Sequence, residues 1–138
     1  RNPYLGEFHF TYTINMNLPL YNSLKTPMST VFVPYGGIKG FFVTYNGSSY
    51  YAWEAACPNH IANTCERLHC ASKSGGGNTF ERCDDTNTQS FIFVQCPCDG
   101  TVYNLVNGSP IAIDKVTSPY HLLYYNVSVA GNILTISN

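Results

Sequence analysis

Charged residues are scarce in this sequence, and long apolar runs are missing. Only 11% of the 138 residues are Asp, Glu, Lys or Arg, and the formal net charge is −1. A chain with so few charges and no excess of basic residues lacks the positive surface that binds nucleic acid, so we expect no nucleic-acid partner. Because no apolar run approaches the ~18 residues of a membrane span, we also expect no transmembrane segment in this chain. The sequence begins at Arg1 rather than Met, which leaves room for an upstream signal peptide or lipid anchor.

Catalytic signatures are missing as well. Ser, His and Asp are all present, but no nucleophile elbow or triad spacing stands out. The glycine run at residues 75–77 lacks the strand-to-helix context that phosphate-binding loops need. These absences argue against an enzyme and leave at most a redox or electron-transfer role.

The sequence does contain a succession of short β-prone segments. In residues 7–15 aromatic and aliphatic side chains alternate with polar ones, which is the period of a half-buried strand. Similar composition between turn signals predicts further strands at 31–33, 38–45, 50–55, 91–95, 101–105, 121–130 and 133–137. The dipeptides Asn46-Gly47 and Gly131-Asn132 predict tight hairpin turns. The spacing predicts a single antiparallel all-β domain over residues 1–138, with about eight to ten short strands.

Residues 61–89 differ from the rest of the chain. Apolar residues thin out there, and the tract SGGGNT occupies residues 74–79. We interpret this segment as a loop insertion that needs covalent stapling to be ordered. In the strand just before it, Trp53 is expected to support the core or a loop, and Glu54 to be solvated.

Six cysteines lie in the middle third of the chain, at positions 57, 65, 70, 83, 96 and 98. An even number suits disulfides, metal ligands or a mixture of the two. Clustered cysteines and few charges suggest an exported protein. Asn46, Asn107 and Asn126 each begin an Asn-x-Ser glycosylation pattern, although the first two are read as turns first.

Two Cys-Pro loops carry the strongest functional signal. The first is CPNH at residues 57–60, and the second is CPCDG at residues 96–100, each just after a predicted strand. Two short loops that each offer a thiolate and a second donor could close a tetrahedral zinc site or hold an iron–sulfur cluster. Disulfides alone are the third interpretation, and the spacing modestly favours them over a metal.

The order of these segments resembles a Rieske iron–sulfur domain from about Phe8 to the end of the chain. That family has a first box Cys-x-His and a second box Cys-Pro-x-His-Gly, followed by an aromatic residue and a later Gly-Pro turn. The segment CPCDGTVYN at 96–104 matches the second box except at Asp99, and NGSP at 107–110 resembles the later turn. The resemblance implies a larger antiparallel β-sandwich or barrel base, and a smaller cluster-type subdomain over residues 55–105 that contains the 61–89 insertion.

The departures from the family pattern bear on the cofactor. Cys57 and Cys96 match the thiolate positions, but His60 comes one residue late and Asp99 replaces the second imidazole. A carboxylate is a harder ligand than an imidazole and adds negative charge, so it suits such a centre less well. We therefore expect the standard 2Fe–2S cluster to be lost. The alternative is a 2Fe–2S or zinc centre on Cys57, His60, Cys96 and Asp99.

The resemblance also implies a disulfide pairing. Quinol-oxidising members of the family join the middle cysteine of the second box to a cysteine after the first box, which implies Cys65–Cys98. Cys70 and Cys83 then remain to staple the insertion, a closure of order 3 kcal/mol in the chain-entropy model. Cys57 and Cys96 would converge on a metal or, without one, lie close enough to bond to each other.

These interpretations lead to one expected function and one alternative. The first is an exported, extracytoplasmic domain, periplasmic or anchored as a lipoprotein, with a structural or binding role toward an unknown protein partner in the cell envelope. The alternative is an electron-transfer protein with an altered metal centre.

Overall fold

The structure is a computed structural model of the 138-residue chain, and it describes residues 10–19, 21–36, 38–59, 65–73, 80–83, 91–112 and 120–137. Within these ranges it has eleven strands and one short 3-10 helix, η1 (Asn22–Lys25). The strands of the larger sheet are β1 (Thr11–Asn15), β2 (Ser29–Val33), β3 (Phe41–Tyr45), β4 (Tyr50–Glu54), β10 (Tyr124–Ala130) and β11 (Ile133–Ser137). Those of the smaller sheet are β5 (His69–Lys73), β6 (Phe80–Arg82), β7 (Phe93–Gln95), β8 (Val102–Asn104) and β9 (Pro110–Ala112).

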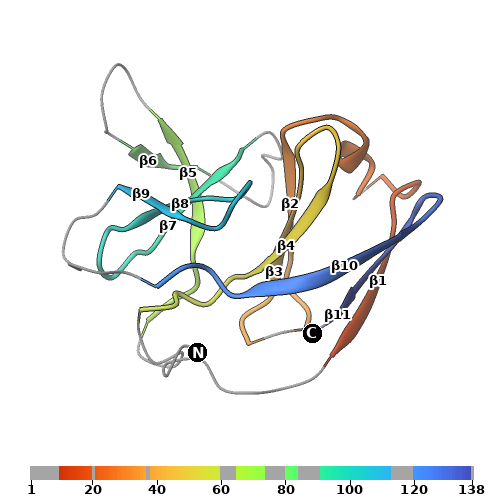
Figure 1. The fold of residues 1–138 in the computed structure, drawn as a ribbon. Coiled ribbons are helices and arrows are strands. Elements are labelled where there is room, and N and C mark those ends of the chain that lie inside the picture. The colour runs from red at the N-terminus through yellow and green to blue at the C-terminus, as the bar shows by residue number, and fades with distance from the viewer. Residues whose placement is uncertain are drawn as a thin grey trace.

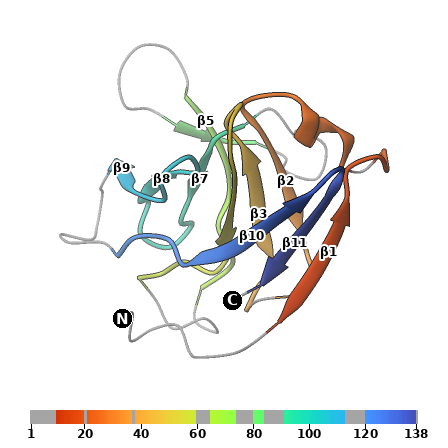
Figure 2. The same ribbon diagram turned by 45° about the vertical axis from the view of Figure 1, so that its right-hand side comes forward.

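The two antiparallel sheets lie beside each other, with the smaller one on the left in Figure 1. The larger sheet has the order β1-β11-β10-β4-β3-β2, and the smaller has the order β6-β5-β7-β8-β9. Strand β10 joins the two parts of the larger sheet, because Tyr124 and Tyr125 pair with β4 while the rest of the strand pairs with β11. The second view shows β10 crossing this sheet obliquely (Figure 2). The prediction of an antiparallel all-β fold is confirmed.

The central strands β3 and β4 separate two hydrophobic cores. Successive side chains of a strand point to opposite faces. Phe41 and Val43 therefore pack inside the larger sheet with Ile14 and Leu134, whereas Phe42 packs toward the smaller sheet. This two-sided burial explains why β3 is almost continuously apolar rather than alternating.

Polar contacts tie the two sheets together across the second core. The Trp53 indole N–H donates to the Leu105 carbonyl oxygen at 2.6 Å, so the predicted supporting role of this residue is confirmed. The Thr30 hydroxyl donates to the Phe91 carbonyl oxygen, also at 2.6 Å. The Leu68 amide donates to the Ala55 carbonyl oxygen at 2.7 Å. These bonds fix the smaller sheet on the base and so position its loops.

The segment predicted as a loop insertion contains two strands. β5 pairs with both β6 and β7, and the Cys70–Cys83 disulfide joins β5 to the residue after β6. The β5 signal in the sequence is weak because its buried residues, His69, Cys70 and Ala71, do not alternate with exposed ones and include a polar side chain. Short pairing with β7 stabilises the strand where its own composition does not. No helix in the described ranges has the length and apolar character needed to cross a bilayer.

Candidate metal and thiol site

Two loops from different sheets bring the candidate residues together. The first follows β4 and carries Cys57, and the second connects β7 to β8 and carries Cys96 and Asp99. In the second loop the Cys96 amide donates to the Thr101 carbonyl oxygen at 2.9 Å, and the Gly100 amide donates to the Cys96 carbonyl oxygen at 3.0 Å. Gly100 has φ +79°, which glycine adopts readily and other residues rarely do. The loop therefore closes tightly on itself, as the Cys-Pro-x-x-Gly pattern predicts.

Glu54 holds the first loop in place, and the prediction that it is solvated is wrong. Its side chain is fully buried, and its carboxylate accepts hydrogen bonds from the backbone N–H groups of Ile38, Lys39 and Ala56 at 2.6, 2.9 and 2.8 Å. The Tyr125 hydroxyl donates to the same carboxylate. A buried carboxylate is stable when its oxygens are saturated by donors. Because Ala56 directly precedes Cys57, these bonds also position the Cys57 loop.

Two disulfides are present, and they have the pairing that the resemblance implied. Cys65 and Cys98 are bonded with an S–S distance of 2.10 Å, and this bond links the segment before β5 to the second loop. Cys70 and Cys83 form the other disulfide. The structure describes all six cysteines, and the remaining two, Cys57 and Cys96, are buried thiols.

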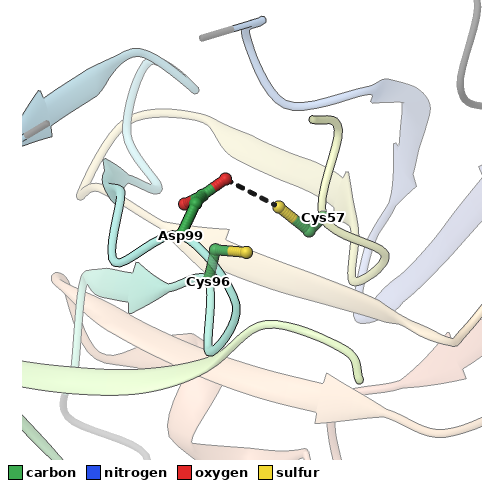
Figure 3. Close-up of side chains that lie close together, drawn as sticks. All are labelled: Cys57, Cys96 and Asp99. Carbon is green, nitrogen blue, oxygen red and sulfur yellow. Dashed lines mark hydrogen bonds between the residues drawn. The ribbon is translucent and has the colours of Figure 1, made fainter. Parts of the chain in front are cut away.

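Cys57, Cys96 and Asp99 point into one space between the two loops (Figure 3). One ligand atom of each residue lies within 4.8 Å of the others, and the side chains are 3, 1 and 2% exposed. The Cys57 sulfur lies 3.9 Å from Asp99 Oδ2, and the Thr101 amide donates to Asp99 Oδ1 at 2.8 Å. Three of the four proposed metal-site residues therefore meet, while His60 lies outside the described residues.

Asn59 completes this site, and the sequence analysis did not select it. Its Nδ2 donates to Asp99 Oδ2 at 3.2 Å, to the Tyr103 hydroxyl at 2.7 Å and to the Cys57 sulfur at 4.0 Å. The Tyr120 amide donates to Asn59 Oδ1 at 2.8 Å, which determines the direction of the side-chain amide. The signal was present in the sequence, because Asn59 stands two residues after Cys57, where the Cys-x-His box has its imidazole.

The two thiols have opposite pKa shifts. A hydrogen bond from Cys57, aided by backbone N–H groups of Asp99 and Cys98, lowers the pKa of Cys96 to about 7. The same hydrogen bond, together with burial, raises the pKa of Cys57 far above the usual range of a thiol. Burial also raises the pKa of Tyr103. The hydrogen-bonded pair of thiols therefore loses its first proton more readily than an isolated thiol, with the lowered pKa on Cys96.

The Cys57→Ala variant is expected to raise the pKa of Cys96 from about 7 toward the ordinary thiol value of about 8.5. The variant removes the largest cause of the depression, while burial and Asp99 still disfavour the thiolate. Ultraviolet thiolate absorbance against pH measures this titration. If wild type and variant titrate at the same pH, the assignment of the thiolate to Cys96 is wrong.

The same shift predicts the pH dependence of stability in the wild type. The folded-state pKa of Cys96 is below the unfolded value, so its contribution is present above the unfolded pKa and is lost as the pH falls through about 7. The raised pKa of Cys57 has the opposite effect, because that contribution diminishes once the pH exceeds the unfolded value. Stability from this pair should therefore rise from neutral pH to a maximum near the unfolded thiol pKa of about 8.5 and fall above it.

The described donor set at this site, Cys57, Cys96 and Asp99, contains no imidazole, and His60 lies outside the described residues. A standard Rieske centre needs two thiolates on one iron and two neutral imidazoles on the other. Beside the two thiols the described residues place Asn59 and Asp99, which hydrogen-bond to each other at 3.2 Å. An amide NH₂ group is only a donor and offers no lone pair to iron. Among the described residues, Cys57, Cys96 and Asp99 can each offer one ligand atom to a single thiophilic cation.

Comparisons with known proteins identify similar folds only. No protein-family model matches the chain, and the search of curated proteins found no significant match. Among solved structures, a chain of the "complex of reduced oxygenase and oxidized ferredoxin in carbazole 1,9a-dioxygenase" is similar, with 19% identity, a TM-score of 0.49, and coverage of 94% of this chain and 92% of the other. The ferredoxin of carbazole 1,9a-dioxygenase from Nocardioides aromaticivorans IC177 is 14% identical, with a TM-score of 0.44 and coverage of 80% and 86%.

Proposed function

We propose that this chain is an exported Rieske-type domain that does not hold the standard 2Fe–2S cluster and that has a structural or binding role in the cell envelope. The observation that carries the proposal is the Asn59–Asp99 hydrogen bond beside the two thiols. The Tyr120 amide and the Tyr103 hydroxyl hold Asn59 in this arrangement. The two loops are thus joined by protein hydrogen bonds in the space between the ligand positions.

The covalent chemistry supports an extracytoplasmic location. The chain contains two disulfides, Cys65–Cys98 and Cys70–Cys83. Disulfides persist in the periplasm and outside the cell, and they are rare in the reducing cytosol. An envelope protein that is periplasmic or lipid-anchored fits this chemistry.

A basic pocket on the smaller sheet supports a binding role. The pocket has a volume of about 480 Å³ and is lined by Lys39, Glu66, Arg67, His69 and Arg82. Three of the seven Lys and Arg residues of the chain therefore gather at one place. The Arg67 guanidinium is 3.8 Å from the centroid of the Phe32 ring, which it covers. Such a pocket favours a partner that presents an acidic group.

The protein purified from cells that assemble iron–sulfur clusters should contain no stoichiometric iron or acid-labile sulfide. Elemental analysis, a sulfide assay and visible absorption measure this directly. The Cys57→Ala and Cys96→Ala variants are the matched controls, because they remove the thiolates that any cluster would need. A brown wild-type protein with two irons and two sulfides per chain, colourless in both variants, would contradict the proposal.

The second candidate is a single-metal centre, either structural or in electron transfer. A tetrahedral zinc site with Zn–S bonds of about 2.3 Å has sulfur atoms about 3.8 Å apart. The Cys57, Cys96 and Asp99 ligand atoms, all within 4.8 Å of one another, need only a small inward shift to reach this geometry. The same elemental analysis distinguishes the candidates, because one zinc per chain that is lost in Cys96→Ala favours the single-metal centre.

A further inference from the structure

Four sulfur atoms form a continuous row from the buried site to the surface. The Cys57 and Cys96 sulfurs lie within 4.8 Å of each other, and the Cys96 sulfur is 4.0 Å from the Cys65 sulfur. Cys65 is in turn bonded to Cys98. Cys57, Cys96 and Cys65 are buried, whereas Cys98 is exposed. A buried dithiol therefore lies next to a disulfide that reaches solvent.

We propose that these four cysteines form a thiol–disulfide exchange relay that transfers two electrons from the buried Cys57/Cys96 pair to a disulfide of a partner protein at Cys98. Thiol–disulfide exchange proceeds by attack of a thiolate on a disulfide sulfur through a mixed disulfide. The relay goes beyond the proposed function but rests on its claim that no cluster is bound, because the Cys57 and Cys96 sulfurs must be free of metal to react. It also gives the partner a chemical class, a protein with an accessible disulfide.

The first half of the relay takes place within the chain. The Cys96 thiolate attacks the Cys65 sulfur, which forms Cys65–Cys96 and releases Cys98 as a thiolate. Cys57 then loses its proton to solvent, and its thiolate attacks the Cys96 sulfur, which forms Cys57–Cys96 and releases the Cys65 thiolate. Two S–S bonds form and two break, so the chain contains one disulfide among these four residues before and after, and needs no outside oxidant.

The second half takes place at the surface. The exposed Cys98 thiolate attacks the partner's disulfide, which forms a mixed disulfide and releases one partner thiolate. The Cys65 thiolate then attacks the Cys98 sulfur, which restores Cys65–Cys98 and releases the second partner thiolate. In total Cys57 and Cys96 are oxidised to a disulfide, the partner's disulfide is reduced to two thiols, and the two protons of the buried dithiol end on the partner.

The arrangement of the loops suits this chemistry. Cys96 and Cys98 are in the same short loop, so the attacking and leaving sulfurs belong to one tight turn. Cys65 lies in the segment just before β5. In the same segment the Leu68 amide donates a hydrogen bond to the carbonyl oxygen of Ala55, which stands two residues before Cys57. The second disulfide, Cys70–Cys83, joins β5 to the residue after β6 and is not part of the row. It serves as an internal control.

The test is native-state alkylation followed by disulfide mapping. The full chain is analysed for metal, adjusted to two thiols per chain, incubated at neutral pH with iodoacetamide and digested for mass spectrometry. We expect the label on Cys98, a new Cys57–Cys96 disulfide and an intact Cys70–Cys83 bond. The Cys57→Ser variant should accumulate the Cys65–Cys96 intermediate. The Cys96→Ser variant should lose the Cys98 label by roughly tenfold or more, because the attacking sulfur is gone.

The outcomes separate the relay from the proposed function. A metal-free wild type with two thiols and no label on Cys98 would overturn the relay and leave the proposed function intact. A sample that purifies with iron on these sulfurs would overturn the proposed function and the relay together. Equal labelling of Cys98 in wild type and Cys96→Ser would show that the disulfide opens without Cys96, which also overturns the relay.

Discussion

Glu54→Gln is expected to lower the free energy of unfolding by about 3–5 kcal/mol. The carboxylate of Glu54 is fully buried and accepts from three backbone N–H groups and from the Tyr125 hydroxyl. The side chain of glutamine has the same size, but its NH₂ group cannot accept a hydrogen bond. At least one of the backbone N–H groups that donate to Glu54 therefore loses its acceptor. Urea-induced unfolding measures the loss.

The Tyr125→Phe variant is the matched control for Glu54. It removes one donor from the carboxylate and leaves the backbone donors paired. We expect it to cost about 1–2 kcal/mol, as the loss of a single hydrogen bond does. If Glu54→Gln costs no more than Tyr125→Phe, the backbone bonds of Glu54 do not contribute in the way the structure indicates.

Gly108→Ala is expected to destabilise the fold by about 2–4 kcal/mol. Gly108 has φ +72°, and a Cβ atom there would lie 2.5 Å from Trp53 Cζ3 and 2.7 Å from Trp53 Cη2. A shift of the Trp53 ring would break the hydrogen bond that its indole N–H donates to the Leu105 carbonyl oxygen. Thermal unfolding measures the loss, and Trp53, as the one tryptophan in the chain, should show a changed emission spectrum.

Gly131→Ala separates the two causes of that loss. Gly131 also has a positive φ, +62°, but no atom lies within 4 Å of the position its Cβ would take. We expect this variant to cost about 1 kcal/mol, from backbone conformation alone. Equal destabilisation by the two substitutions would contradict the close packing of Trp53 against residue 108.

The strands that the sequence predicted are those whose side chains carry a strong local pattern. Alternating residues around Tyr12 and Ile14 and the Gly131-Asn132 turn predicted β1, β10 and β11 within a few residues. Strands β5 and β6 were missed because they are mostly polar, and β9 because it has only three residues and begins at a proline. All three depend on pairing with neighbouring strands. Long-range pairing of this kind has no local periodicity to reveal it.

The candidate site was predicted in outline and corrected in detail. The two Cys-Pro loops and Asp99 were selected from their motifs, and the structure brings Cys57, Cys96 and Asp99 together. Asn59 was missed because an asparagine is an ordinary loop residue until its amide is seen facing Asp99 and Tyr103. Glu54 was misjudged because a carboxylate at a strand end is usually exposed, and only the fold supplies four donors around it.

The sequence by itself determined the all-β class, the positions of the two cysteine loops and the presence of Asp99 in the second loop, because these depend on local pattern and residue chemistry. The tertiary structure alone decided which side chains saturate one another: Asn59 with Asp99, Glu54 with the loop around Lys39, and the Cys96 sulfur 4.0 Å from Cys65. These contacts join residues 15 to 40 positions apart in the sequence. Their geometry follows from how two sheets pack, which no short stretch of sequence encodes.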